Sequence, residues 1–141
     1  MFHYGHAQQF EQAKKMFKNV HLIVGISPDE EVLRLKGPLV MTELERSRNV
    51  QHCKWVDEVI MPCPWVITED YLEKHKIDYV AHDDLPYAHP EADDIYYKVK
   101  ALGKFRATQR TEGVSTTELI TRILQKRDYY FERQFKRGAT R

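Results

Sequence analysis

Four short apolar runs of strand length are separated along the chain by amphipathic segments of helical character. The runs span residues 21–26, 57–63, 78–83 and 104–109. The first run, HLIVGI, is a continuous stretch of branched residues, typical of a strand that is covered on both faces in a parallel sheet. Alternating strands and helices with short connections predict an α/β fold, a Rossmann-like three-layer α/β/α sandwich with a parallel sheet. Ligands of such folds gather at the carboxyl ends of the strands.

Capping sequences predict where three of the helices begin. The pairs are Ser27 with Glu30, Thr42 with Glu45, and Ser115 with Glu118. In this Ser/Thr-x-x-Glu pattern, the hydroxyl and the carboxylate accept hydrogen bonds from backbone N–H groups of the first turn. Pro28, at the expected first helical position, strengthens the first of these starts. The charged and aromatic stretch 125–141 predicts a C-terminal helical extension of a domain formed by residues 1–124.

Composition narrows the class of protein. The 141 residues suit a single domain, and 22 Lys and Arg nearly balance 21 Asp and Glu. This balance argues against a nucleic acid or an anionic membrane as the partner. Cys53 and Cys63 fit no disulfide or metal pattern, and no signal peptide or membrane-length apolar run is evident. We therefore expect a reduced, cytoplasmic protein.

The motif His-Tyr-Gly-His at residues 3–6 stands at the start of a helical pattern. A helix N-terminus carries unpaired N–H groups and partial positive charge, so imidazoles beside a small glycine favour a phosphate-binding site. The alternative is structural, with His3 capping the helix and His6 lying on its surface. The other histidines and the cysteines lack metal-site spacing, so we expect no metal held by the protein.

The second motif, Arg-Thr-Glu-Gly-Val-Ser-Thr, covers residues 110–116. It places Arg110 and Thr111 at the end of a predicted strand, and Ser115 and Thr116 at the N-terminus of the last predicted helix. A guanidinium, hydroxyls and helix N–H groups that converge in this way are suited to hold a polyanion. An ordinary strand, turn and capped helix would explain Ser115, but it would not explain Arg110 and Thr111.

Together the HYGH and RTEGVST motifs resemble the paired signature of the cytidylyltransferases. The similarity continues through LIVGISPDE, ERSRNVQHCKWVDEV and YVAHDDLPY, and it covers nearly the whole chain. It is greatest to the catalytic domain of the choline-phosphate cytidylyltransferase family. The resemblance implies transfer of CMP from CTP to phosphocholine, giving CDP-choline and pyrophosphate for phosphatidylcholine biosynthesis. It also implies Mg2+ bound with CTP, and a homodimer.

The resemblance assigns roles to individual residues. It makes His3, His6, Lys36 and Arg110 catalytic. It implies CTP contacts from Gly5, His6, Lys36, His82, Asp83, Gln109, Arg110, Thr111, Val114, Ser115 and Thr116. It implies phosphocholine contacts from Lys36, Trp65, Tyr87 and Tyr96.

The expected contacts differ in chemistry. Lys36 would reach the phosphates of both substrates from a flexible loop, and Asp83 would accept a hydrogen bond from the cytosine amino group. The quaternary ammonium of choline has no hydrogen to donate, so its site needs aromatic faces and a nearby negative charge. Without the resemblance, Lys36 would be read as an exposed loop lysine and the aromatic residues as core.

The nature of the acceptor substrate leaves two alternatives. The segments FHYGH and KGP resemble the ethanolamine-phosphate enzymes, whereas CPW and YVAHDDLPY resemble the choline-phosphate enzymes. We favour choline because the aromatic residues would touch the group in which the two substrates differ. A non-catalytic relative that binds only nucleotide or an intact subunit is a further alternative.

The resemblance also implies a strand and loop of the type Tyr-Ala-Asp-Gly-x-Phe-Asp before the HYGH motif, in the middle of the sheet. We expect this first central strand to be missing, which would leave its neighbours with unpaired edges. We therefore expect residues 1–141 alone to be marginally stable and weakly active. The membrane-responsive helix of the family is not encoded in these residues, although full-length relatives can be nuclear or membrane-associated.

Overall fold

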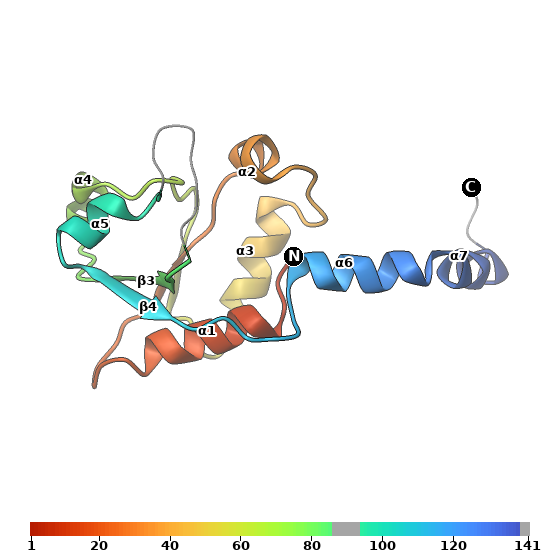
Figure 1. Cartoon of the computed structure of the whole chain (residues 1–141), viewed down its shortest axis with the longest axis horizontal. Coiled ribbons are helices and arrows are strands. Elements are labelled where there is room, and N and C mark those ends of the chain that lie inside the picture. Colours follow the sequence, from red (N-terminus) through yellow and green to blue (C-terminus); the bar gives the residue numbers. More distant parts are fainter. Residues whose placement is uncertain (86–93, 139–141) are drawn as a thin grey trace. The chain divides into compact units, whose positions relative to one another are not determined.

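The structure is a computed structural model that describes residues 1–85 and 94–138 (Figure 1). Contacts within the chain define two compact units, Met1–Thr111 and Glu112–Arg141. Tyr87, one of the residues expected to contact phosphocholine, lies outside the described residues.

Helices and strands alternate through the first unit, as the apolar pattern predicts. In order they are α1 (Tyr4–Lys14), β1 (Ile23–Gly25), α2 (Asp29–Lys36), α3 (Glu43–Gln51), β2 (Glu58–Ile60), α4 (Glu69–Lys74), β3 (Val80–Asp83), α5 (Tyr97–Ala101) and β4 (Phe105–Thr108). All four predicted strands are confirmed, and each is shorter than its apolar run. The first unit is therefore a mixed α/β structure.

The strands form two separate parallel pairs. β1 pairs with β2, with Ile23 opposite Glu58, and β3 pairs with β4, with Val80 opposite Phe105. The predicted parallel direction is confirmed. Among the described residues, no strand joins one pair to the other.

The apolar run at β1 is less buried than its sequence predicts. Ile26, just after the strand, is 6% exposed, whereas Ile23 and Val24 within the strand are only half-buried. The expectation of a strand covered on both faces is therefore wrong for β1. The physical reason is that, in the part of the chain described, β1 has a neighbouring strand on one side only.

Two of the three predicted helix starts are confirmed. The Thr42 hydroxyl accepts a hydrogen bond from Glu45 N at 3.3 Å, and the Glu45 carboxylate accepts one from Thr42 N at 2.8 Å. This is the reciprocal capping box expected from the sequence. In the second unit, the Ser115 hydroxyl accepts a hydrogen bond from Glu118 N at 3.0 Å.

The predicted cap at Ser27 is wrong, because α2 begins one residue later with Pro28 at its N-cap position. The first backbone donor of the helix, Asp29 N, is satisfied from α3 by the Glu43 carboxylate at 2.8 Å. Arg46, also on α3, donates to the Ser27 carbonyl at 2.8 Å and to the Asp29 carboxylate at 2.6 Å. A tertiary contact with α3 therefore replaces the local hydroxyl cap.

The tightest packing of the first unit is around the β3–β4 pair. Leu72 on α4 and Val99 on α5 are both 0% exposed and form a cluster with Ile67. Val80 of β3 and Phe105 of β4 pack against this cluster. Figure 1 shows α4 and α5 beside this strand pair. The ends of β3 and β4 are therefore carried on the best-packed part of the unit.

The second unit contains two consecutive helices, α6 (Thr116–Gln125) and α7 (Arg127–Lys136). Lys126 is the C-cap residue of the first helix and the N-cap residue of the second. α7 lies within the predicted extension 125–141, and the division of the chain into a domain and an extension at that point stays a prediction. In the described residues, no helix combines the length and apolar character that a bilayer span requires.

Candidate active site

The two histidines of the HYGH motif lie against each other at the N-terminus of α1. His3 is the N-cap residue, and its backbone N donates a hydrogen bond to His6 Nδ1 at 3.3 Å. The two ring centroids are 3.9 Å apart. Because Nδ1 of His6 accepts this bond, the neutral ring carries its proton on Nε2. Among the described residues, His3 Nδ1 is buried without a hydrogen-bond partner.

Both imidazoles are held in the neutral form. Burial, followed by the neighbouring His3 ring, lowers the pKa of His6 from 6.5 to about 4. Burial also lowers the pKa of His3. Near neutral pH the pair therefore presents N–H donors to a ligand rather than full positive charges.

The lowered pKa of His6 makes the stability of the protein depend on pH. Since the folded form disfavours the imidazolium, protonation of His6 in the unfolded chain destabilises the fold as the pH falls from 6.5 towards 4. From pH 7 to pH 5, we expect the free energy of unfolding to fall by about 2 kcal/mol less in His6→Asn than in the unsubstituted protein. Urea unfolding at the two pH values measures the difference. The exposed His52→Asn variant should behave like the unsubstituted protein, and an unchanged pH dependence in His6→Asn would contradict the assignment.

A glutamine side chain joins α1 to the residue that follows β4. The Gln12 amide donates to the Gln109 carbonyl at 3.1 Å and accepts from Gln109 N at 2.8 Å. One turn earlier on α1, Gln8 accepts a hydrogen bond from the Thr111 hydroxyl at 2.5 Å. The HYGH helix is thereby bonded to Gln109, just before the RTEGVST segment, and to Thr111 within it. Gln8 and Gln12 belong to neither sequence motif, although their i, i+4 spacing places them on one helix face.

An aspartate and an arginine meet at the carboxyl ends of β3 and β4. Asp83, the last residue of β3, has a side chain that is only 6% exposed, and its Oδ2 lies 3.1 Å from Arg110 Nε. The same oxygen is 3.4 Å from His82 Nδ1, and Oδ1 accepts a hydrogen bond from Leu85 N at 3.3 Å. This is the strand edge at which the α/β pattern predicts a ligand. The expected cytosine contact of Asp83 stays a prediction.

Lys36 brings a second cationic group to this region, in addition to Arg110. It is the last residue of α2, and Gly37 follows at φ 92°, so the expected flexible loop is wrong for Lys36 itself. Burial lowers the pKa of Lys36, the Arg110 guanidinium lowers it further, and the Asp83 carboxylate raises it. Lys36 is exposed as a whole residue, but its ammonium lies close enough to both Arg110 and Asp83 for their charges to shift its pKa.

Two of the expected choline-site aromatics lie in the first unit. The Trp65 ring is covered by the Lys36 ammonium, with Nζ 5.1 Å from the ring centroid. The Tyr96 ring lies 4.9 Å from that of His82 and 5.4 Å from that of Phe105. The structure thus joins Trp65 to Lys36, and Tyr96 to the end of β3.

The expected site residues divide between the two units. The HYGH histidines and Gly5, together with Lys36, Trp65, the β3 and β4 ends, Tyr96 and Thr111, belong to the first. Val114, Ser115 and Thr116 belong to the second, where Ser115 and Thr116 form the start of α6. The convergence of these residues on the phosphate groups of a ligand stays a prediction.

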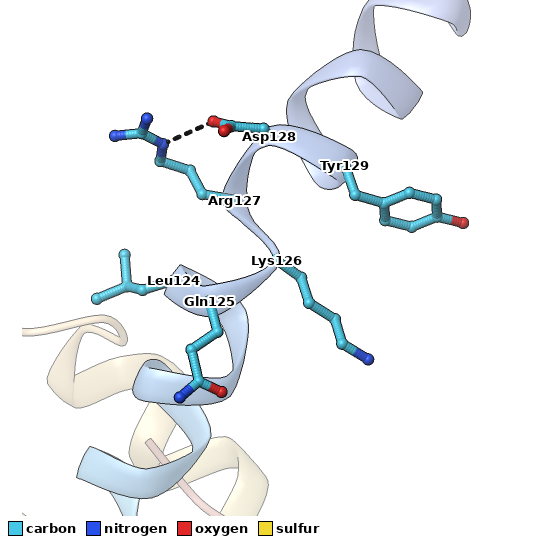
Figure 2. Close-up of a pocket in the computed structure, with 6 residues that line it drawn as sticks. All are labelled: Leu124, Gln125, Lys126, Arg127, Asp128 and Tyr129. Atoms are coloured by element: carbon cyan, nitrogen blue, oxygen red, sulfur yellow. Dashed lines mark hydrogen bonds and ion pairs between the residues drawn. The ribbon is translucent and has the colours of Figure 1, made fainter.

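A surface hollow at the junction of α6 and α7 is not the candidate site. Figure 2 shows its lining, Leu124, Gln125, Lys126, Arg127, Asp128 and Tyr129. Arg127 Nε and Asp128 Oδ1 form an ion pair at 3.0 Å within it. None of the residues expected to bind substrate lines this hollow.

The cationic and N–H donor groups of this region are of the kind that binds anions. Within residues 1–85 and 94–138, no three His, Cys, Asp or Glu side chains are grouped so that they could hold a metal. Neutral imidazole donors, a guanidinium and an ammonium are instead the groups that bind phosphate oxygens.

Comparison with known proteins identifies the family of the chain. The model of the Cytidylyltransferase-like family matches residues 1–122. The chain is 57% identical over 141 residues to the probable choline-phosphate cytidylyltransferase of Schizosaccharomyces pombe, covering 100% of this chain and 39% of that protein. For the choline-phosphate cytidylyltransferase of Saccharomyces cerevisiae the identity is 52% over 141 residues, covering 100% of this chain and 33% of that protein.

A relative that is named for ethanolamine phosphate has a lower sequence identity to the chain. The mouse ethanolamine-phosphate cytidylyltransferase is 44% identical over 124 residues, covering 88% of this chain and 30% of that protein. The chain spans less than half the length of each of these three relatives. The family match and the identities lead to one conclusion: the chain belongs to the cytidylyltransferase-like family.

Proposed function

We propose that this domain transfers CMP from CTP to phosphocholine. A phosphate oxygen of phosphocholine attacks the α-phosphorus of CTP in line. The bond from that phosphorus to the oxygen bridging the α and β phosphates breaks, and pyrophosphate leaves with the electron pair. CDP-choline is the other product. Such a reaction needs no nucleophilic side chain, so the protein contributes orientation and neutralisation of the developing charge.

Residues of the first unit have different roles in this reaction. His6, neutral with its proton on Nε2, donates to the triphosphate as charge builds on the leaving oxygen, and His3 supports it at the same helix end. Arg110, held at the edge of the strands by Asp83 at 3.1 Å, supplies a planar donor set for phosphate oxygens. Lys36 supplies the mobile ammonium that reaches the phosphates of both substrates.

The observation that carries the proposal is the Lys36–Trp65 contact, because it joins a phosphate-binding ammonium to an aromatic face suited to a quaternary ammonium. The test is formation of CDP-choline from CTP and phosphocholine with magnesium present. Phosphoethanolamine as the better substrate would favour the ethanolamine reaction. Nucleotide binding without product from either acceptor would favour a non-catalytic relative.

Replacing Trp65 should affect the acceptor substrate selectively. We expect Trp65→Leu to raise the KM for phosphocholine about tenfold or more, because a desolvated cation–π contact contributes about 2 kcal/mol. The KM for CTP should change less than twofold. Steady-state kinetics with each substrate varied in turn measures both values. Trp55→Leu, which removes a ring covered by Lys15 and Lys54, is the matched control, and equal effects of the two substitutions would contradict the choline site.

The finer features of the fold and assembly belong to the same proposal. We propose that the two parallel strand pairs belong to one sheet of a three-layer sandwich, with a further strand between β1 and β3. The support is the shared parallel direction of the pairs and the one-sided pairing of β1 and β3 among the described residues. Magnesium is proposed to arrive with the triphosphate of CTP, and the working enzyme to be a homodimer.

A further inference from the structure

One side chain of the site lies where the proposed substrate should place its own cation. The Lys36 ammonium lies 5.1 Å from the centroid of the Trp65 ring, within the range of a cation–π contact. Trp65 is half-buried, whereas Lys36 is exposed as a whole residue, so it is the ring that is partly shielded from water. The face of the ring is therefore covered by an ammonium that belongs to the protein.

The surroundings of Lys36 explain why an aromatic face suits it. Arg110 is close enough to lower the pKa of Lys36, so a second cation acts on the ammonium. The Asp83 carboxylate, which raises that pKa, is already bonded to Arg110 Nε at 3.1 Å. The negative face of Trp65 gives the ammonium a further stabilising contact.

We propose that Lys36 and the trimethylammonium of phosphocholine compete for the face of Trp65, and that the bound substrate moves the Lys36 ammonium from the ring to its phosphate. The inference rests on the proposed function. One ring face does not hold two cations at this distance without strong repulsion. Lys36 has a flexible four-carbon stem, so its ammonium changes partners without movement of α2.

The exchange makes Lys36 a specificity-determining residue. Phosphocholine displaces the ammonium and supplies the phosphate that receives it. Free choline displaces the same ammonium but has no phosphate to bind it. The site therefore discriminates against unphosphorylated choline without a steric barrier. Choline breaks the Lys36–Trp65 contact but offers the Lys36 ammonium no new partner.

NMR spectroscopy with 13C-labelled lysine tests the exchange directly. The Lys36 ε-methylene signal, identified by its absence in Lys36→Ala, should be shifted upfield by the Trp65 ring current and should return to the ordinary position in Trp65→Leu. Saturating choline chloride and saturating phosphocholine should each remove the shift. Lys54 and Lys15, whose ammonium groups lie 4.5 and 5.0 Å from the Trp55 ring centroid, are internal controls whose signals should stay in place.

Binding measurements test the consequence. We expect Lys36→Ala to bind free choline about fivefold more tightly than the unsubstituted protein, and phosphocholine more weakly. Lys54→Ala should change neither affinity. Choline that binds while the Lys36 signal stays in place, or choline affinity that does not rise in Lys36→Ala, would overturn the inference.

The same experiments separate the inference from the proposed function. Displacement of Lys36 by choline in a protein that forms no CDP-choline supports the exchange and refutes the proposed reaction. CDP-choline formation with a Lys36 signal that never leaves the Trp65 ring supports the reaction and refutes the exchange.

Discussion

His6→Ala lowers the turnover of CTP and phosphocholine by about two orders of magnitude or more, while the KM for phosphocholine changes little. Loss of one preorganised donor to developing charge typically has an effect of about this size. His6 is the donor expected to act in this way, because its Nδ1 accepts from His3 N at 3.3 Å and its proton therefore lies on Nε2. Product formation at saturating CTP, with phosphocholine varied, separates turnover from substrate binding.

Two further variants sharpen this expectation. His6→Gln keeps a side-chain N–H of similar reach and should recover part of the turnover, whereas His52→Ala, at an exposed position, should retain nearly all of it. If His6→Ala turns over at the unsubstituted rate, the HYGH motif has only the structural role of ordering the start of α1.

The sequence pattern predicts most of the fold because it depends on local chemistry. Alternating apolar runs place all four strands, and the hydroxyl caps at Thr42 and Ser115 place two helix starts. The prediction fails at Ser27 because the donor at the start of α2 is satisfied by Glu43, which is remote in sequence. It also overestimates the burial of β1, since burial depends on neighbours that a single run of residues does not reveal.

The candidate site shows the same division between local and tertiary information. The motifs and the family resemblance identify the histidines and Arg110, which carry recognisable chemistry. They do not identify Gln12, whose amide bonds both backbone groups of Gln109, because that role exists only once α1 and β4 lie together. Nor do they predict that the ammonium of Lys36 covers the ring of Trp65. Contacts between segments that are distant in the sequence are the part of the site that local sequence patterns do not predict.

Arg110→Lys is the second substitution for which we expect a large loss. Lysine keeps the charge but loses the planar set of five donors, one of which contacts Asp83 at 3.1 Å. We expect kcat/KM for CTP to fall about 100-fold, because the phosphate contacts act where charge develops. Arg106→Lys is a matched control on β4 itself, since the Arg106 guanidinium lies 4.2 Å from the Tyr79 ring rather than against Asp83.

A double-mutant cycle between Asp83→Asn and Arg110→Lys tests why Arg110 is effective. If the carboxylate acts by orienting the guanidinium, Asp83→Asn should lower kcat/KM for CTP strongly in the Arg110 protein but only slightly in the Arg110→Lys protein. The combined loss would then be far smaller than the product of the two single losses. Independent effects that multiply would show that Asp83 acts on the substrate separately, as its expected cytosine contact requires. An Arg110→Lys protein with unchanged kcat/KM would remove Arg110 from the phosphate site altogether.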